Sequence, residues 1–396
     1  MRWALARRTG RYELSKVGGE EVQAFVPFHL PPDAPPLDLS GELGQRLRAA
    51  DGALARLEIA GAMVPSLGWF LYVFVRKEAV LTSQIEGTRA TLVDLLAAEA
   101  EAANGDIAES HPTEDLREVS NYLAALAFSM EQLADPGGLP LSVRLLTEAH
   151  GRLMRGAPEG QPGEVRNTQN WIGGTRPGNA AFVPPPPHAL ADTLSALEQY
   201  LHGDDDLPPL VRVGLVHAQF ETIHPYLDGN GRIGRLLIAL ALDHWKLHGQ
   251  PLLYLSLFFK RHRQEYYRRL RAVAAEGDWE GWLAFFLDGV ETIADEAVAS
   301  ARELFALVSE DRARVLAQAG TSLTAARLFE QLPKHPIVSV AFVTRRLGIT
   351  KPTAGRAVEA LERASVLVET TGRKRERSWA YQSYLERLRE GTDLTS

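Results

Sequence analysis

The chain of 396 residues contains no cysteine. It therefore cannot form a disulfide framework, a thiolate nucleophile or a thiolate metal site. Long apolar runs are also missing, because stretches such as 236–242 and 69–75 are far shorter than the ~20 residues that a bilayer span needs. We expect no membrane-spanning segment and no membrane partner.

The N-terminus lacks the apolar centre of a secretory signal, since residues 1–8 are followed by a polar stretch. The default location for such a chain is cytoplasmic. The hydrophobic fraction of 45% and the charged fraction of 23% are ordinary for a globular protein. The length favours two or three domains, each with its own core.

Charge is unevenly distributed along the chain. Residues 321–396 carry 13 Lys and Arg against 8 Asp and Glu, whereas the rest of the chain carries 30 against 42. A basic tail on an acidic body makes nucleic acid a candidate partner for the tail, and a solvated surface is the alternative interpretation.

The order of patterns along the chain predicts a mainly helical protein. Residues 1–40 contain proline pairs and few periodic apolar positions, which favours an extended arm packed on a later domain. The segment 171–187 is the one β element that we expect in the body, a short hairpin that runs into a proline-rich turn. Helical periodicity predicts the following segments: 40–57, 69–81, 116–133, 210–222, 233–248 closed by Gly249 and Pro251, 261–275 and 279–308.

The tail has a different pattern. Helical runs at 322–332, 339–347 and 352–364 precede a strand-like segment at 366–370 and a basic turn. Three helices followed by a β-wing are the order of a winged helix-turn-helix.

Between the predicted helices 210–222 and 233–248 lies a loop with the chemistry of a phosphate site. Gly229 and Gly231 flank Asn230 just before a helix, so backbone N–H groups can approach an anion without obstruction by Cβ atoms. Arg232 and Arg235 lie three residues apart, on one face of the first turn, where each can bind phosphate oxygens.

Two further side chains complete this pattern. Asp228 offers a carboxylate for Mg²⁺, which binds proteins through one or two carboxylates together with substrate phosphates. His224 ends the preceding helix and can take a proton from a hydroxyl that attacks a bound phosphate. Neither a P-loop nor a dinucleotide fingerprint fits, because the Gly-Lys-Ser/Thr and the preceding strand are missing. The residues predict phosphoryl or nucleotidyl transfer.

The segment 224–235, His-Pro-Tyr-Leu-Asp-Gly-Asn-Gly-Arg-Ile-Gly-Arg, resembles the signature of the Fic domain. Tyr226 replaces the usual phenylalanine, a core anchor, and should leave the chemistry intact if its hydroxyl finds a partner. The resemblance extends from about Tyr12 through the tail and implies transfer of AMP from ATP to a Tyr, Ser or Thr hydroxyl, with release of pyrophosphate.

The resemblance also implies roles for individual residues. His224 would be the base, Asp228 the Mg²⁺ ligand, and the segment 171–187 the flap that holds the target protein by strand addition. An ordinary surface loop is the alternative interpretation of 171–187. His262, followed by Tyr266 and Tyr267, would lie at the nucleotide pocket. The residues that would bind ATP are Glu86, Gly229, Asn230, Gly231, Arg232, Ile233, Gly234, Arg235 and His262.

Thr82–Gly87 resembles the inhibitory motif of the Fic family, in which a glutamate restrains the enzyme. Glu86 would then pair with Arg235, and in some relatives this glutamate also supports removal of AMP. An ordinary solvated position at a helix end is the alternative for Glu86.

The tail leaves two interpretations open, DNA binding through residues 339–377 or a protein-interaction module. Acidic side chains at Glu359, Glu362 and Glu369 weigh against DNA. The basic side chains that favour phosphate contacts are Arg345, Arg346, Lys351, Arg356 and Arg373–Arg375.

The predicted organisation is an arm with inhibitory helices (1–112), a Fic catalytic domain (113–300), a connecting helix (301–320) and a winged helix-turn-helix (321–396). The rival function is a DNA-binding regulator in which the Fic domain senses nucleotides. Transfer of UMP, phosphocholine or phosphate is a third possible function. The sequence also leaves open whether the protein forms a homodimer.

Overall fold

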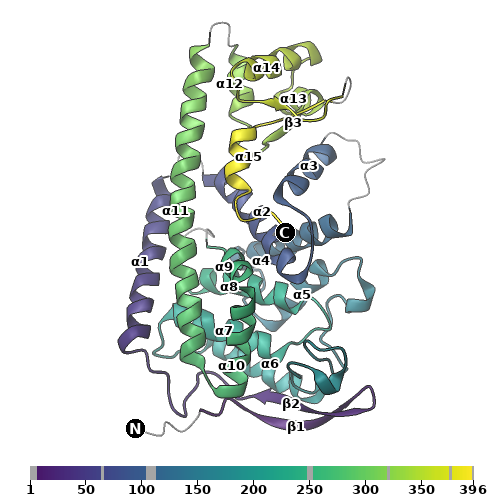
Figure 1. The fold of residues 1–396 in the computed structure, drawn as a ribbon, viewed down its shortest axis with the longest axis vertical. Helices are drawn as coiled ribbons and strands as arrows, with labels where there is room; N and C mark the ends of the chain where they lie inside the picture. The colour runs from purple at the N-terminus through teal and green to yellow at the C-terminus, as the bar shows by residue number, and fades with distance from the viewer. Residues whose placement is uncertain are drawn as a thin grey trace. The chain divides into compact units, whose positions relative to one another are not determined.

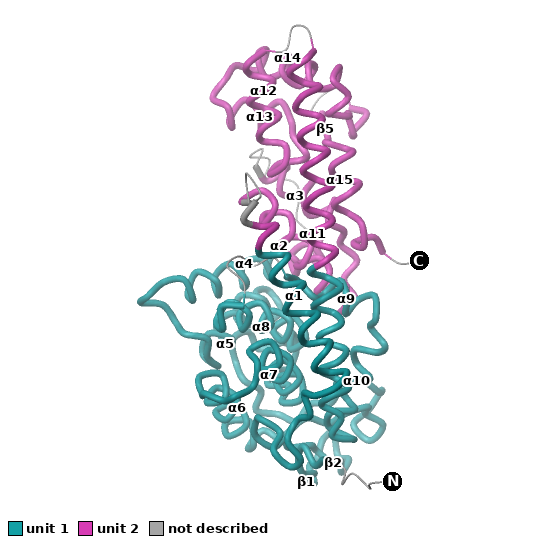
Figure 2. The backbone as a smooth tube through the Cα atoms, turned by 90° about the vertical axis from the view of Figure 1, so that its left-hand side faces the viewer, with its two compact units in different colours: residues 1–58, 120–294 teal, residues 59–119, 295–396 magenta. Residues whose placement is uncertain are grey.

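The computed structural model describes residues 7–63, 67–103, 113–247, 253–318, 322–373 and 377–394, and it is mainly helical (Figure 1). The chain divides into two compact units, residues 1–58 with 120–294 and residues 59–119 with 295–396 (Figure 2). The boundaries between the units fall inside helices α1 (Gly41–Met63), α4 (Glu114–Ala134) and α11 (Trp279–Ala317). Among the described residues, no helix is both long enough and apolar enough for a membrane span.

The first unit is a helical bundle around α7. Almost every residue of α7 is buried, as expected for a helix that is packed on all sides. Helices α6, α8 and α10 pack against it. Besides parts of α1, α4 and α11, the α-helices of this unit are α5 (Val143–Leu153), α6 (Pro187–His202), α7 (Pro209–Ile223), α8 (Asn230–His244), α9 (Ser256–Arg261) and α10 (Arg263–Glu276).

A β-hairpin lies at the start of this unit and corrects the expectation that 171–187 is the only β element of the body. Strands β1 (Gly10–Val17) and β2 (Glu20–Pro27) pair in antiparallel register through a two-residue turn. Gly18 and Gly19 both have positive φ, +57° and +85°, which is the backbone that such a tight turn requires.

The rest of the N-terminal arm packs on later helices, as predicted. Arg7 forms a two-point ion pair with Glu280 of α11, with both N···O distances at 2.7 Å. The Gln219 side chain of α7 donates to the carbonyl of Phe28 at 2.8 Å. The arm is therefore part of the first unit.

The predicted hairpin at 171–187 is reduced to one antiparallel bridge between Ile172 and Phe182. The segment between them contains a short 3-10 helix, η2 (Pro177–Asn179), and another, η1 (Pro158–Gly160), precedes the flap. Strand β2 lies beside the flap, because Phe25 N–H donates to Val183 O at 2.9 Å. The flap therefore lies at the edge of the N-terminal hairpin, next to strand β2.

The second unit contains α2 (Leu67–Glu86), α3 (Leu92–Ala103) and the tail. The tail runs in the order helix, strand, helix, helix, strand, strand, helix, and its three strands form a sheet in the order β3–β5–β4. The tail elements are α12 (Leu323–Phe329), β3 (Ile337–Ser339), α13 (Val340–Leu347), α14 (Lys351–Arg363), β4 (Val368–Glu369), β5 (Ser378–Ala380) and α15 (Gln382–Leu388).

The mainly helical fold predicted from the sequence is confirmed. Helix α8 begins at Asn230 and ends at His244, about four residues short of the predicted end, and Gly249 and Pro251 lie outside the described residues. The three tail helices lie where the periodicity placed them. The identification of the tail as a winged helix-turn-helix stays a prediction, as do the domain boundaries.

Candidate active site

His224 ends helix α7 in a left-handed conformation, with φ +49° and ψ +62°. This conformation costs a non-glycine residue roughly 1–2 kcal/mol, and it is further disfavoured because Pro225 follows. Such strain persists only where the surroundings fix the backbone. The ring Nδ1 lies 3.3 Å from the Glu221 carbonyl oxygen, so Nδ1 carries the hydrogen in that contact and Nε2 is the atom that can accept a proton.

Asn230 closes the α7–α8 loop (residues 224–229). Its side-chain oxygen accepts the Tyr226 N–H at 2.9 Å, and its side-chain nitrogen donates to the Tyr226 carbonyl at 2.8 Å. The Tyr226 ring is buried, and its hydroxyl lies 3.2 Å from the Thr147 hydroxyl. The hydroxyl that Tyr226 adds to the usual phenylalanine therefore has a hydrogen-bond partner, as the sequence analysis required.

Helix α5 forms the floor beneath the loop. His150 lies 3.1 Å from the Asp228 carbonyl through Nε2 and accepts the Gly163 N–H at Nδ1, so Nε2 is the donor. Burial lowers the pKa of His150 to about 4, and its ring stacks on Tyr226 at 3.9 Å. Gly229 has φ +76°, and a Cβ there would lie 3.0 Å from the Met154 sulfur, so both backbone angle and space require glycine.

The two motif arginines are buried in the first turns of α8. Arg232 lies 3.6 Å from the Asp228 carboxylate and 3.8 Å from the Met154 sulfur. The positive charge of Arg235 contributes to lowering the pKa of His217, after the larger effect of burial. Together with the N-terminal end of α8, whose first N–H groups lack intrahelical partners, the arginines make this end of the helix strongly positive.

The remaining motif residues occupy different environments. Gly231 is half-buried, whereas Ile233 is fully buried in the core. Gly234 faces α7, because a Cβ there would lie 3.3 Å from the Phe220 ring, and its carbonyl accepts from His217 Nδ1 at 2.8 Å. These contacts give Ile233 and Gly234 a packing role between α7 and α8.

Asp228 meets the requirements of a magnesium ligand. Its side chain is 66% exposed, and one carboxylate oxygen accepts the Gly229 N–H at 2.6 Å, which orients the group. The described residues contain no cluster of three or more His, Cys, Asp or Glu side chains that could cage a metal. A metal held by Asp228 would take its other ligands from phosphate oxygens and water, as Mg²⁺ commonly does.

Three predicted site residues lie outside the motif 224–235. His262 caps the end of α9, is exposed, and packs against Phe258 at a ring distance of 4.6 Å. Tyr266 is a core residue whose hydroxyl contacts His217 at 2.9 Å. Glu86 is the exposed last residue of α2 and belongs to the second unit, so its pairing with Arg235 stays a prediction.

Sequence reasoning missed the residues that hold the loop from outside the motif. Arg166 donates to the His224 carbonyl at 2.9 Å, Asn170 to the Tyr226 carbonyl at 3.2 Å, and His150 contacts the Asp228 carbonyl. Each is a single polar residue distant from the motif in sequence, and no spacing pattern identifies it.

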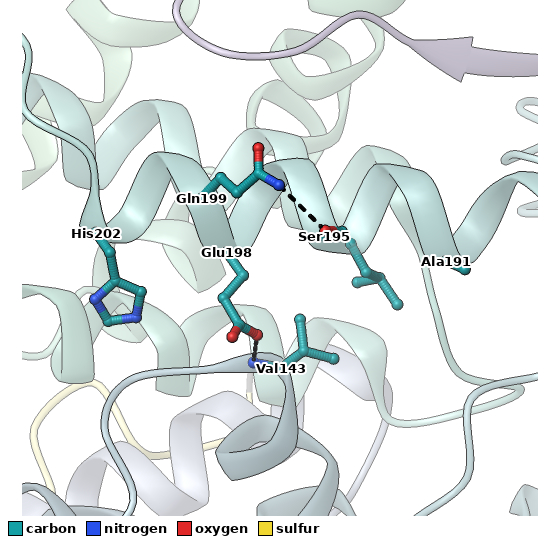
Figure 3. Close-up of a pocket in the computed structure, with 7 residues that line it drawn as sticks. Val143, Ala191, Ser195, Glu198, Gln199 and His202 are labelled. Atoms are coloured by element: carbon teal, nitrogen blue, oxygen red, sulfur yellow. Dashed lines mark hydrogen bonds between the residues drawn. The ribbon is translucent and has the colours of Figure 1, made fainter.

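A separate pocket of about 500 Å³ lies between the start of α5 and the outer face of α6 (Figure 3). Its polar groups are already used, since Glu198 accepts the Val143 N–H at 2.7 Å and His202 lies 2.8 Å from the Leu141 carbonyl oxygen. None of the motif residues lines this pocket, so we do not assign the chemistry to it.

Comparison with known proteins matches two segments of this chain. Residues 45–131 match the N-terminal model of the Fic/DOC family, and residues 140–242 match the Fic/DOC family model. A protein adenylyltransferase Fic of Drosophila grimshawi is 31% identical over 159 residues, which cover 40% of this chain and 30% of that protein. The corresponding protein of Culex quinquefasciatus is 31% identical over 157 residues, 39% of this chain and 29% of that protein. The chain thus spans about a third of the length of the curated relatives it matches.

Solved structures support the fold. A Fic family protein from Desulfovibrio desulfuricans superposes with a TM-score of 0.56 at 21% identity, covering 87% of this chain and 97% of that one. A Fic domain containing signaling protein from Bacteroides thetaiotaomicron gives a TM-score of 0.53 at 17% identity, covering 64% and 97%. At these identities the likeness concerns the fold alone.

Proposed function

Because the chain contains a Fic/DOC N-terminal region and a Fic domain, we propose that it transfers AMP from ATP to a hydroxyl side chain of a target protein. The observation that supports this most directly is the α7–α8 loop. It places His224, held in a strained backbone conformation, at one end and the positive N-terminus of α8 at the other.

In the proposed reaction, the hydroxyl oxygen of the target attacks the α-phosphorus of ATP. A new oxygen–phosphorus bond forms, the bond to the leaving pyrophosphate breaks, and the hydroxyl proton moves to Nε2 of His224. The contact between His224 Nδ1 and the Glu221 carbonyl supports this assignment, because it favours the tautomer in which Nε2 is unprotonated.

The phosphates would lie against the N-terminus of α8. Backbone N–H groups of Asn230 and Gly231 and the side chains of Arg232 and Arg235 provide hydrogen-bond donors and positive charge at this end. Asp228 would hold Mg²⁺, which when bound neutralises phosphate charge. The target would dock on the flap, whose exposed Trp171 lies next to Asn170, a residue bound to the loop.

We further propose that Glu86 restrains the enzyme. The glutamate ends α2 and is followed by Gly87, which has φ +113° and so terminates the helix. A carboxylate on Arg235 would compete with the phosphates for the same guanidinium group. We also propose that the same site removes AMP, that the enzyme modifies itself, and that it is located in the cytoplasm.

The proposal is tested with ATP labelled in the α-phosphate. We expect label on proteins of a cell lysate or on the enzyme itself, and His224→Ala should lose about 10²–10⁴-fold in rate while it binds ATP normally. ATP labelled in the γ-phosphate, UTP labelled in the α-phosphate and labelled CDP-choline serve as controls for the other transfer reactions. Label from any control but not from α-labelled ATP would contradict AMP as the group moved.

DNA binding by the tail is the second candidate function. Arg345, Lys351 and Arg356 are exposed on and between helices α13 and α14. Glu369 still weighs against DNA, because hydrogen bonds from Thr371, one of them from its N–H at 2.8 Å, lower the pKa of this carboxyl and keep it charged. The residues Lys374 and Arg375 lie outside the described residues. A mobility shift of duplex DNA that weakens with added salt and in the Lys351→Ala variant supports this function. The absence of a shift at low salt argues against it.

A further inference from the structure

One buried arginine connects the two parts of the proposed site. Arg166 is 2% exposed, and its guanidinium donates to three backbone carbonyl groups. Nε binds the His224 oxygen at 2.9 Å, and the two terminal nitrogens bind the Thr168 oxygen at 3.0 Å and the Pro185 oxygen at 2.6 Å. The described residues place no carboxylate in an ion pair with Arg166, and burial lowers the pKa of its guanidinium to about 10.

The first contact bears on the orientation of His224. Its left-handed backbone is fixed on one side by its own N–H, which donates to the Phe220 carbonyl at 2.9 Å. Arg166 fixes the other side, because its side chain binds the His224 carbonyl and its N–H binds the Pro225 carbonyl at 2.9 Å. This backbone sets the direction of the His224 Cα–Cβ bond, so Arg166 fixes the point from which the imidazole extends.

The other two contacts bear on the flap. Thr168 and Pro185 lie on the two sides of its base, just outside the bridge between Ile172 and Phe182. The planar guanidinium presents its donors at fixed angles, so one side chain sets the distance between the two sides of the flap and the His224 carbonyl. An uncharged side chain with fewer donors cannot hold all three carbonyls at once.

We propose that Arg166 is a positioning residue that holds the base and the target-binding flap in one rigid frame. A hydroxyl presented on the flap then meets Nε2 of His224 at the correct distance. The proposal rests on the proposed function for its catalytic consequence, whereas its structural part concerns only this chain.

The test compares three variants. Arg166→Gln removes the charge and most of the donors, and Arg166→Lys keeps the charge without the fork. Arg212→Gln is the control, because Arg212 is also buried in the first unit and donates to two carbonyls, those of Tyr200 and Gly203, both at 2.7 Å. Unlike Arg166, Arg212 also lies 3.5 Å from a carboxylate, that of Asp205.

Transfer of label from α-labelled ATP is measured per molecule of ATP bound, with Mg-ATP affinity and stoichiometry determined by calorimetry. Misplacement by about 1 Å costs a reaction about 10²-fold, so we expect that loss in Arg166→Gln, a smaller loss in Arg166→Lys and wild-type ATP affinity in both. A merely structural role would lower the binding stoichiometry and leave the rate per bound ATP unchanged.

Hydrogen exchange of the free protein provides a readout that does not need activity. In Arg166→Gln, peptides covering 168–185 and 224–229 should both exchange faster, whereas in Arg212→Gln they should match the wild type. If neither the wild type nor Glu86→Gly transfers label, the proposed function fails, and hydrogen exchange alone tests the role of Arg166. Unchanged exchange in both peptides, or the same rate loss in Arg212→Gln, overturns the proposal.

Discussion

Acid should destabilise the first unit through His217, and replacing this residue should reduce that sensitivity. His217 is fully buried, where Nδ1 lies 2.8 Å from the Gly234 carbonyl and Nε2 lies 2.9 Å from the Tyr266 hydroxyl. Burial lowers its pKa from 6.5 to about 3, with a smaller effect from Arg235. The folded protein therefore keeps His217 neutral at a pH where the unfolded chain protonates it.

The magnitude follows from proton linkage. Because the pKa of His217 is depressed in the folded state, its contribution to the free energy of unfolding is complete above the unfolded pKa of 6.5. This contribution is lost as the pH falls toward the folded value of about 3. At about pH 5, which is about 1.5 units below the unfolded pKa, the loss is about 2 kcal/mol, since one unit corresponds to about 1.36 kcal/mol. This is a large part of the 5–15 kcal/mol that stabilises a typical protein.

Urea unfolding at about pH 7.5 and about pH 5, measured for the wild type and for His217→Gln, tests this reasoning. Glutamine can donate to Gly234 and accept from Tyr266 but does not titrate. We expect the variant to be less stable at the higher pH and to lose about 2 kcal/mol less on acidification. The exposed residue His262 provides a control variant, His262→Gln, with the wild-type pH dependence. Equal losses in the wild type and in His217→Gln would refute the argument.

Three further predictions concern the site. Asp228→Ala should make transfer very slow and insensitive to added Mg²⁺, and a titration that keeps the wild-type rate and metal dependence contradicts Asp228 as the ligand. Glu86→Gly should raise transfer at saturating ATP by at least about tenfold, since a charge-assisted hydrogen bond contributes about 1.5–3 kcal/mol and about 1.4 kcal/mol is tenfold. The double variant with Arg235→Ala should lose that gain, and equal rates for the wild type and Glu86→Gly exclude the restraint. Tyr226→Phe should retain transfer and lower the free energy of unfolding by about 0.5–1.5 kcal/mol, because the Thr147 hydroxyl loses its partner; a loss of activity in a stable Tyr226→Phe protein would show that the hydroxyl has a chemical role.

The elements predicted from the sequence are those that depend on local pattern. Helical periodicity located α7, α10 and the three tail helices, because an apolar stripe is visible within one segment. The β1–β2 hairpin was missed although its signal is present: Gly18-Gly19 separates two segments of alternating character. The proline pairs that follow the hairpin are typical of an extended arm, and such an arm was predicted for the whole of residues 1–40.

The site was predicted only as far as the motif reaches. The motif indicated His224, Asp228 and the two arginines, but it could not show that Asn230 binds the loop backbone or that Gly234 packs on α7. Those roles depend on residues brought together by the fold. The α8 boundary was also missed, since a helix that is buried almost all round leaves no polar face to mark its ends.

The supporting residues have a shared electrostatic consequence for the α7–α8 loop. Backbone carbonyl oxygens carry partial negative charge, and any that faced the phosphates would repel them. Arg166 binds the His224 carbonyl, Asn170 binds the Tyr226 carbonyl, and His150 donates to the Asp228 carbonyl. These donors lie on segments outside the motif and turn the negative ends of the loop's peptide groups into the protein. Within the motif, Asn230 also donates to the Tyr226 carbonyl, at 2.8 Å. If the proposed function holds, the preference of this loop for an anion would therefore depend on Asn230 together with Arg166, Asn170 and His150, which the motif does not contain.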